Sequence, residues 1–317
     1  MNPLPDYRKK ISVVVPVYNE EENVAAFHKE ITDVCNANQF DYEIIFIDDG
    51  STDKTREVIK KLSPVRLITF RRNFGQTAAM DAGFKHAKND YIVTMDGDGQ
   101  NDPKDIPQLI SYLEENDLDV VSGWRKKRKD SFMKRLVSRG ANYLRKFMIN
   151  DGISDSGCSL KVYKKECFDH LTLYGEMHRF IPAILKIKGF KIGELEVNHR
   201  PRTKGKTKYN WTRTFKGFID MISVWFWNKF AVRPLHLLGG IGLFFLFIGG
   251  IFACATIYSY LYVHQDLSNT LLPLMTVFFV ITGILLFVLG LISDILVKNY
   301  YETTKDISYS IKEITEN

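Results

Sequence analysis

Two long stretches in the last third of this 317-residue chain contain no Asp, Glu, Lys or Arg. They run from Leu235 to Val263 and from Leu271 to Ser293. A helix needs about 20 apolar residues to cross the hydrocarbon core of a bilayer, so each stretch is long enough to span a membrane. The alternative is a pair of buried helices in a soluble core, but their length and close succession favour a transmembrane hairpin.

Basic residues around the two stretches predict their orientation. The connection at residues 264–270 has no Lys or Arg, whereas Lys229, Arg233, Lys298 and Lys305 flank the outer ends. Positive residues are enriched on the cytoplasmic side of membrane proteins. The first residues lack the apolar run of a signal peptide. We therefore expect both chain ends in the cytoplasm.

Changes in composition divide the chain into four parts. Trp211, Phe215, Phe218, Ile222 and Trp225 recur at helical spacing just before the first apolar stretch, which predicts a helix at the level of the lipid headgroups. The parts are then a soluble domain at residues 1–209, an interfacial segment at 210–234, the hairpin at 235–297 and a cytoplasmic tail at 298–317. The four cysteines are scattered and indicate neither a disulfide framework nor a zinc site.

Within the soluble domain, apolar runs alternate with helical patterns. Strands are predicted near residues 11–17, 42–47, 65–70, 91–95 and 118–122, with helices between them. This alternation is typical of an α/β domain with a mostly parallel, Rossmann-like sheet. Ligands of such sheets bind beyond the carboxyl ends of the strands. The loops after the first four strands should therefore meet at one edge.

The loop after the fourth predicted strand reads Asp96-Gly97-Asp98-Gly99-Gln100. Side chains alternate along an extended chain, so the two carboxylates share a face. Like charges this close together are stable when a cation lies between them. Few hard oxygen ligands suit Mg²⁺ or Mn²⁺, which proteins often share with substrate phosphates. An acidic turn in solvent is the alternative for an isolated motif of this kind.

Four loop motifs occur together at the predicted edge. They are Val15-Pro16-Val17-Tyr18-Asn19-Glu20, Asp48-Asp49-Gly50-Ser51-Thr52-Asp53, Arg72-Asn73-Phe74-Gly75 and Asp96-Gly97-Asp98-Gly99-Gln100. In order and spacing they resemble the family 2 glycosyltransferases of GT-A fold. The closer resemblance is to polyprenyl-phosphate glycosyltransferases, the group of dolichol-phosphate mannose synthase and bactoprenol glucosyltransferase. It covers residues 11–209, and the hairpin resembles the bacterial membrane-anchored branch.

The resemblance implies transfer of one sugar from a nucleotide-sugar, UDP-glucose or a similar UDP-hexose, to polyprenyl phosphate such as undecaprenyl phosphate. The transfer would be metal-dependent and inverting, and the product would serve cell-envelope glycosylation at the bacterial inner membrane. No nucleic-acid partner is expected, and the helices of neighbouring chains can pack as a homo-oligomer. The alternatives are an anchored glycosyltransferase with a different acceptor and a catalytically inactive membrane scaffold.

The resemblance also assigns roles to residues. Asp96 and Asp98 would hold Mg²⁺ or Mn²⁺ and act in catalysis, and Asp155 is the candidate general base. Residues expected to bind the nucleotide-sugar are Pro16, Tyr18, Glu20, Asp48, Asp49, Asn73, Gly75, Asp96 and Gln100. Residues expected to bind the acceptor phosphate are Arg125, Arg128, Arg179, Arg200, Arg202 and Lys206.

Two features leave roles open. Basic residues in the acceptor set suit phosphate binding, but each can instead tether the domain to anionic lipid. The stretch from Asp155 to Leu160 departs from the Asp-Phe-Arg of many relatives, so the identity of any base stays open. The Gln-x-x-Arg-Trp motif of processive synthases is absent, which favours a single transfer.

Overall fold

The computed structural model describes three long stretches, residues 8–126, 152–201 and 234–304, and the single residues 225, 229 and 230. Within the long stretches, residues 170, 172, 174, 176 and 265 are not described. The chain divides into two compact units, Met1–Val224 and Trp225–Asn317. Most of the predicted interfacial segment and the end of the predicted tail lie outside the described residues.

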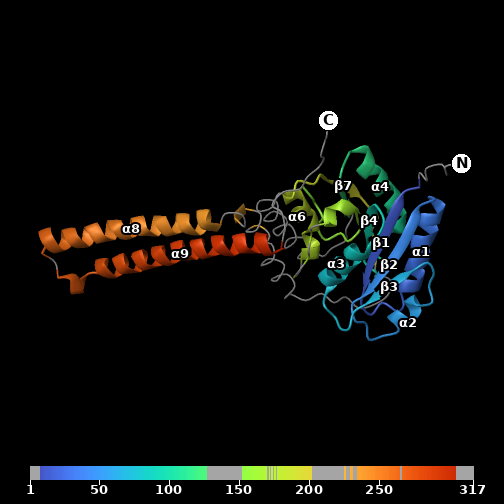
Figure 1. Cartoon of the computed structure of the whole chain (residues 1–317), viewed down its shortest axis with the longest axis horizontal. Helices are drawn as coiled ribbons and strands as arrows, with labels where there is room; N and C mark the ends of the chain where they lie inside the picture. Colours follow the sequence, from blue (N-terminus) through green and yellow to red (C-terminus); the bar gives the residue numbers. More distant parts are fainter. Residues whose placement is uncertain are drawn as a thin grey trace. The chain divides into compact units, whose positions relative to one another are not determined.

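A seven-stranded sheet forms the centre of the first unit, in the order β3-β2-β1-β4-β6-β5-β7 (Figure 1). The strands are β1 (Lys10–Val17), β2 (Asp41–Asp48), β3 (Arg66–Thr69), β4 (Tyr91–Thr94), β5 (Val120–Trp124), β6 (Lys161–Lys164) and β7 (Ile192–Glu196). β1 is parallel to β2 and β4, β2 to β3, and β5 to β7. The predicted mostly parallel sheet is confirmed. However, β6 is antiparallel to both β4 and β5 and separates them.

Helices cover both faces of this sheet. They are α1 (Val24–Ala37), α2 (Thr55–Ile59), α3 (Gln76–His86), α4 (Ile106–Glu115) and α6 (Ile181–Ile187), with short 3₁₀ turns η1 (Pro103–Asp105), η2 (Lys165–Phe168) and η3 (Met177–Arg179). α1, α2 and α4 bury apolar side chains against one face, and α3 and α6 against the other. Alternation along β1 directs Val13 and Val15 to the first face and Val14 to the second, so both faces of the strand are buried.

The second unit contains two long helices, α8 (Pro234–Tyr262) and α9 (Leu272–Thr304), joined through the turn η4 (Leu267–Asn269). Both are long and apolar enough to cross a membrane. The large apolar side chains exposed in the described part of the chain lie on these helices or their connection, apart from Phe74 and Ile187. The helices start close to the predicted residues, and α9 continues past Ser293 to Thr304.

The two helices pack through close approach of their backbones. A Cβ atom added to Gly242 would lie 2.7 Å from the carbonyl oxygen of Gly283, and one added to Gly283 would lie 2.8 Å from that of Gly242. Gly240, by contrast, has nothing within 4 Å of such an atom. Nearer the connection, the Oγ1 atoms of Thr256 and Thr276 form a hydrogen bond of 3.4 Å between the helices.

Candidate functional site

Asp48 ends β2 and lies beneath the loop that follows. Its side chain has no exposed surface. Oδ1 accepts a hydrogen bond from Ser51 N at 3.0 Å, and Oδ2 forms an ion pair with Arg56 Nε at 2.6 Å. The buried Asp48 side chain therefore shapes this loop, and the nucleotide contact that the sequence predicts for Asp48 stays a prediction. Arg56, the partner of this buried charge, was not predicted.

Asp49 joins the loops that follow β2 and β3. Its Oδ1 accepts from Phe74 N at 2.7 Å and its Oδ2 from Gly75 N at 3.0 Å. Burial raises the pKa of Asp49, and these two hydrogen bonds partly oppose the rise. Gly50 has a positive φ of 75°, and a Cβ atom there would lie 2.4 Å from the carbonyl carbon of Arg72, so the two loops touch through backbone. The two nucleotide-binding residues predicted in the loop after β3, the exposed Asn73 and the half-buried Gly75, are held at this contact.

The loop after β1 is tied to the same structure. Asn19 N donates to Ser51 Oγ at 2.9 Å, and Thr52 N donates back to Asn19 Oδ1 at 2.8 Å. Glu20 N donates to Thr55 Oγ1 at 2.9 Å. The predicted residues Pro16, Tyr18 and Glu20 are half-buried here. The three loops thus form one hydrogen-bonded rim at the carboxyl edge, as the strand pattern predicts.

Asp96 and Asp98 follow β4 at the same edge and are both half-buried. Gln76 Nε2, at the first position of α3, donates to Asp96 Oδ1 at 2.8 Å, and Gln100 N donates to Asp98 Oδ1 at 3.1 Å. Burial and the charge of Asp98 raise the pKa of Asp96, so a cation bound here would stabilise both carboxylates. Gln76 was not predicted, although its place after the third strand puts it at the edge where ligands bind.

The donor set fits a divalent ion that takes ligands from a substrate. Among the described residues, no group of three or more His, Cys, Asp or Glu side chains is placed to hold a metal. Asp96 and Asp98 can therefore supply only part of a coordination shell. Mg²⁺ and Mn²⁺ accept sites completed by water and substrate phosphates.

Asn101 is buried and supports the acidic loop. Its Oδ1 accepts from Asp96 N at 3.3 Å and from Ser159 Oγ at 2.7 Å. The backbone of Asn101 also forms an antiparallel bridge with His199, and Arg200 N donates to Gln100 O at 2.9 Å. The acidic loop is thereby fixed to two segments that are distant in sequence.

Arg200 is paired with two acids beside this loop. Its Nη1 lies 2.6 Å from Glu30 Oε2 and its Nη2 lies 2.7 Å from Asp102 Oδ1. Burial would lower the pKa of Arg200, but the hydrogen bonds and charges of the two acids raise it. The contact of Arg200 with an acceptor phosphate stays a prediction, and it would have to compete with these ion pairs.

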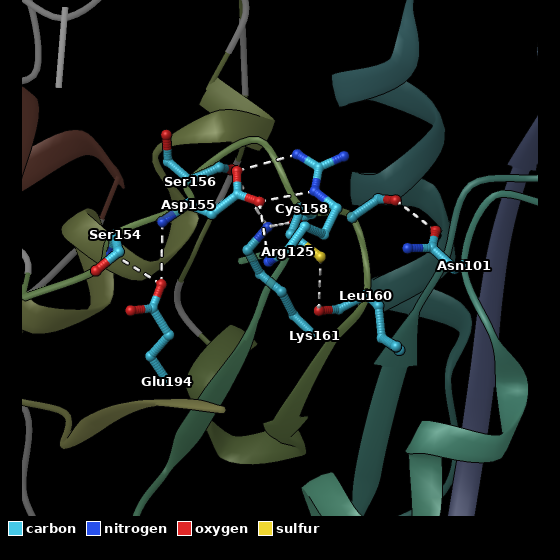
Figure 2. A network of polar contacts seen from close by, with 10 residues as sticks. Asn101, Arg125, Ser154, Asp155, Ser156, Cys158, Leu160, Lys161 and Glu194 are labelled. Carbon is cyan, nitrogen blue, oxygen red and sulfur yellow. Dashed lines mark hydrogen bonds and ion pairs between the residues drawn. The ribbon is translucent and has the colours of Figure 1, made fainter. Parts of the chain in front are cut away.

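Arg125 and Asp155 form a half-buried ion pair at the end of β5 (Figure 2). Arg125 Nε donates to Asp155 Oδ2 at 2.7 Å and Nη2 donates to Oδ1 at 3.0 Å. Burial alone would raise the pKa of Asp155, but the bonds and charge of Arg125 hold it below its usual value. A carboxylate with a lowered pKa and both oxygens bound to a guanidinium is a weak base, so this geometry argues against the base role predicted for Asp155.

Lys161 and Glu194 fix the loop that carries Asp155 (Figure 2). Lys161, buried at the start of β6, donates from Nζ to the carbonyl oxygens of Cys158 and Ser156. Glu194 Oε1, from β7, accepts from Ser154 N at 2.8 Å and from Asp155 N at 3.0 Å. The sequence did not predict a role for Lys161 or Glu194. The feature that could have indicated one is a charged residue inside a short strand, where apolar residues are usual.

Four residues remain of those expected to bind the acceptor phosphate, and one of them, Arg179, lies within the described residues. His178 Nδ1 lies 2.7 Å from Thr77 Oγ1 in the first turn of α3, which ties η3, and with it Arg179, to the start of this helix. Arg128, Arg202 and Lys206 lie outside the described residues.

The sequence profile of glycosyl transferase family 2 matches residues 12–172, which include the loops described above up to the Asp155 segment. The chain belongs to this glycosyltransferase family. Its GT-A fold is therefore confirmed, as is the expectation that the protein is a glycosyltransferase.

Relatives with similar sequences cover nearly the whole chain. A dodecaprenyl-phosphate galacturonate synthase of Rhizobium johnstonii is 34% identical over 316 residues, which cover 97% of this chain and 94% of the relative. An undecaprenyl-phosphate 4-deoxy-4-formamido-L-arabinose transferase of Aeromonas hydrophila is 31% identical over 315 residues, with 98% and 95% covered.

Solved structures resemble the fold. Glucosyl-3-phosphoglycerate synthase of Mycobacterium tuberculosis, in complex with Mn²⁺, UDP-glucose and phosphoglyceric acid, has a TM-score of 0.55 at 17% identity and covers 68% of this chain and 80% of its own. Mannosyl-3-phosphoglycerate synthase of Rubrobacter xylanophilus has a TM-score of 0.53 at 16% identity, with 68% and 73% covered. These similarities concern the fold alone.

Proposed function

We propose that this glycosyltransferase moves one sugar from a nucleotide-sugar to the phosphate of a polyprenyl phosphate, with undecaprenyl phosphate as the expected acceptor. The observation that carries the proposal is the extent of the likeness to two polyprenyl-phosphate sugar enzymes. It covers 97% and 98% of this chain, and therefore both the sheet unit and the two long helices.

The helices support a lipid acceptor. A polyprenyl chain lies in the bilayer, and α8 and α9 would keep the glycosyltransferase unit at its surface. We further propose that they form a hairpin in the bacterial inner membrane with both chain ends in the cytoplasm, since basic residues flank only their outer ends. Packing of hairpins from neighbouring chains would give a homo-oligomer.

The rim loops and the acidic loop would bind the donor. Asp49 fixes the backbone of residues 74 and 75, and the half-buried Pro16, Tyr18 and Glu20 lie on the neighbouring loop after β1, where we propose that they contact the nucleotide. Asp96 and Asp98 would hold Mg²⁺ or Mn²⁺, and when bound this ion neutralises charge on the departing nucleoside diphosphate. The donor is proposed to be UDP-glucose or a similar UDP-linked sugar.

The acceptor would react without a strong base. A phosphate monoester is already anionic at neutral pH, so positioning and neutralisation of charge are sufficient for its attack on the anomeric carbon. The weakly basic Asp155 is consistent with this chemistry. A single displacement by the acceptor phosphate inverts the anomeric centre.

The test is a donor screen with the full-length protein in lipid nanodiscs, undecaprenyl phosphate and Mg²⁺ or Mn²⁺. UDP-glucose, UDP-galacturonate and UDP-4-deoxy-4-formamido-L-arabinose, each radiolabelled in the sugar, form the panel. We expect label from at least one donor in solvent-extractable lipid. Label that appears only in protein or polysaccharide would favour another acceptor, and no transfer from any donor would favour the inactive scaffold.

A further inference from the structure

The Arg125–Asp155 pair leaves part of the guanidinium available. The side-chain hydrogen bonds of Arg125 to described residues use Nε and Nη2, both to Asp155, so Nη1 has no partner within the described part of the chain. β4 and β5 are both antiparallel to the β6 strand between them, so Arg125 after β5 and Asp96 after β4 lie at the same, carboxyl edge of the sheet, and 11% of the Arg125 side chain is exposed there. The charges of Arg125 and Asp96 also influence each other, which places the guanidinium in the electrostatic field of the acidic loop.

The pair is held by separate strands. Arg125 directly follows β5, and Asp155 precedes β6 in a loop that Lys161 of β6 holds by its carbonyl oxygens. Glu194 of β7 holds the same loop by the amides of residues 154 and 155 (Figure 2). Three neighbouring strands therefore determine where Asp155 lies, and Asp155 determines how the guanidinium is turned.

The fixed Arg125–Asp155 pair is better suited to binding an anion through Arg125 than to accepting a proton at Asp155. Arg binds phosphate best when its planar fork is already oriented, because little side-chain freedom is then lost on binding. A base, in contrast, needs an accessible oxygen and a proton affinity that the neighbouring guanidinium removes. Both oxygens of Asp155 are occupied by Arg125.

We propose that Asp155 is a positioning residue that turns the Nη1 edge of Arg125 toward a substrate phosphate, and that Glu194 and Lys161 position Asp155 in turn. This inference rests on the proposed function in taking the ligand to be a phosphate of the donor or of the lipid acceptor. The two sources share the same chemistry and are separated by experiment.

The experiment measures binding without turnover. Full-length protein in nanodiscs is titrated calorimetrically with two probes, UDP in the presence of Mn²⁺ and farnesyl phosphate, a short polyprenyl phosphate. The variants are Asp155→Asn, Arg125→Met and the double variant, which removes both charges of the pair together. Asp119→Asn is the control, because Asp119 pairs with Lys164 at 2.8 Å at the opposite end of β5 and β6.

We expect Asp155→Asn to weaken one probe about tenfold, the range for loss of a charge-assisted hydrogen bond. Arg125→Met should weaken the same probe at least as much, and the double variant no more than Arg125→Met. Weakened farnesyl phosphate binding assigns Arg125 to the acceptor, and weakened UDP binding assigns it to the donor diphosphate. A general loss of structure would weaken both probes, and Asp119→Asn should weaken neither.

Two results would overturn the inference. In the first, Asp155→Asn leaves both affinities unchanged but abolishes sugar transfer, as loss of a base would. In the second, the two single variants weaken binding independently and their effects multiply in the double variant. Because the titrations need no turnover, a wild-type protein that makes no glycolipid would contradict the proposed function without deciding this inference.

Discussion

The two units of this protein hold their parts together in different ways. In the sheet unit, the site is built by polar side chains with specific partners, such as Asp49 with two backbone amides and Arg125 with Asp155. In the hairpin, the backbones approach closely at Gly242 and Gly283, where an added Cβ atom would lie within 3 Å of the facing carbonyl oxygen. The site therefore depends on charge and hydrogen-bonding capacity, whereas the hairpin depends on volume.

The surroundings explain the difference. In the sheet unit, a buried charge that loses its partner is left uncompensated, at a cost of about 3–5 kcal/mol. Between helices that span a membrane, as we propose for α8 and α9, no hydrophobic force favours association over contact with lipid, so close van der Waals packing of small residues must do so. Substitutions that change charge should act on the first unit and substitutions that change size on the second.

The largest effect is expected from the two acids that we propose hold the metal ion, Asp96 and Asp98. Asp98→Ala removes half of the carboxylate pair and should lower the rate of sugar transfer at least about 100-fold, because loss even of supporting residues around a metal costs 10–100-fold. Excess chelator should do the same to the wild type, and added Mn²⁺ should restore it. Radiolabelled transfer to lipid measures both. Full activity in chelator would remove the metal from the mechanism.

The second-largest effect is expected from a larger side chain between the two helices of the hairpin. Gly242→Val would force side-chain atoms into the backbone of α9, where even a Cβ would lie 2.7 Å from Gly283 O. We expect a loss of about 1–3 kcal/mol in stability, as for overpacked cores. Thermal unfolding in detergent measures it. Gly240→Val is the matched control, since Gly240 has open space, and equal effects of the two variants would contradict the packing described.

Removal of an uncharged side chain from the site should lower activity less than removal of a carboxylate. Gln76→Ala removes the amide that donates to Asp96 Oδ1 at 2.8 Å and should lower kcat/KM about tenfold, the equivalent of roughly 1.4 kcal/mol. Steady-state kinetics with the active donor measures this. Gln108→Ala on the exposed side of α4 is the control and should leave the kinetics unchanged. Equal rates for both variants would remove Gln76 from the support of Asp96.

The smallest effect is expected from the polar contact between the hairpin helices. Thr256→Val removes the 3.4 Å hydrogen bond to Thr276, together with the 2.8 Å hydrogen bond to Phe252 O within α8, while keeping the side-chain volume. Hydrogen bonds between membrane helices contribute about 0.6 kcal/mol on average, so we expect a shift at the limit of detection in thermal unfolding. A loss as large as that from Gly242→Val would show that hydrogen bonding, and not volume, holds the hairpin.

The sequence predicted those features that depend on local patterns. The strand alternation placed the loops after β1, β2, β3 and β4 at one edge, and the lack of charge marked α8 and α9 to within a few residues at their starts. These signals are local because burial on both faces of a strand, or immersion in lipid, constrains each residue separately.

Features that depend on distant partners were not predictable in this way. β6 pairs between β4 and β5, although neither its length nor its composition shows that it reverses direction. The sequence did not predict that Asp48 is buried and paired with Arg56, or that Asp155 is paired with an arginine 30 residues away. A single sequence shows that a charged residue is present, but it does not show which charge faces it.

The structure of the lipid product tests the central claim most directly. The product made from an α-linked donor such as UDP-glucose would be purified and its anomeric configuration read from NMR coupling constants and from coupling to phosphorus. We predict a β-linked sugar on a polyprenyl monophosphate, since direct attack by the acceptor phosphate inverts the centre. An α-linked product would require a covalent intermediate on an enzyme nucleophile, and it would contradict both the single displacement and the positioning role of Asp155.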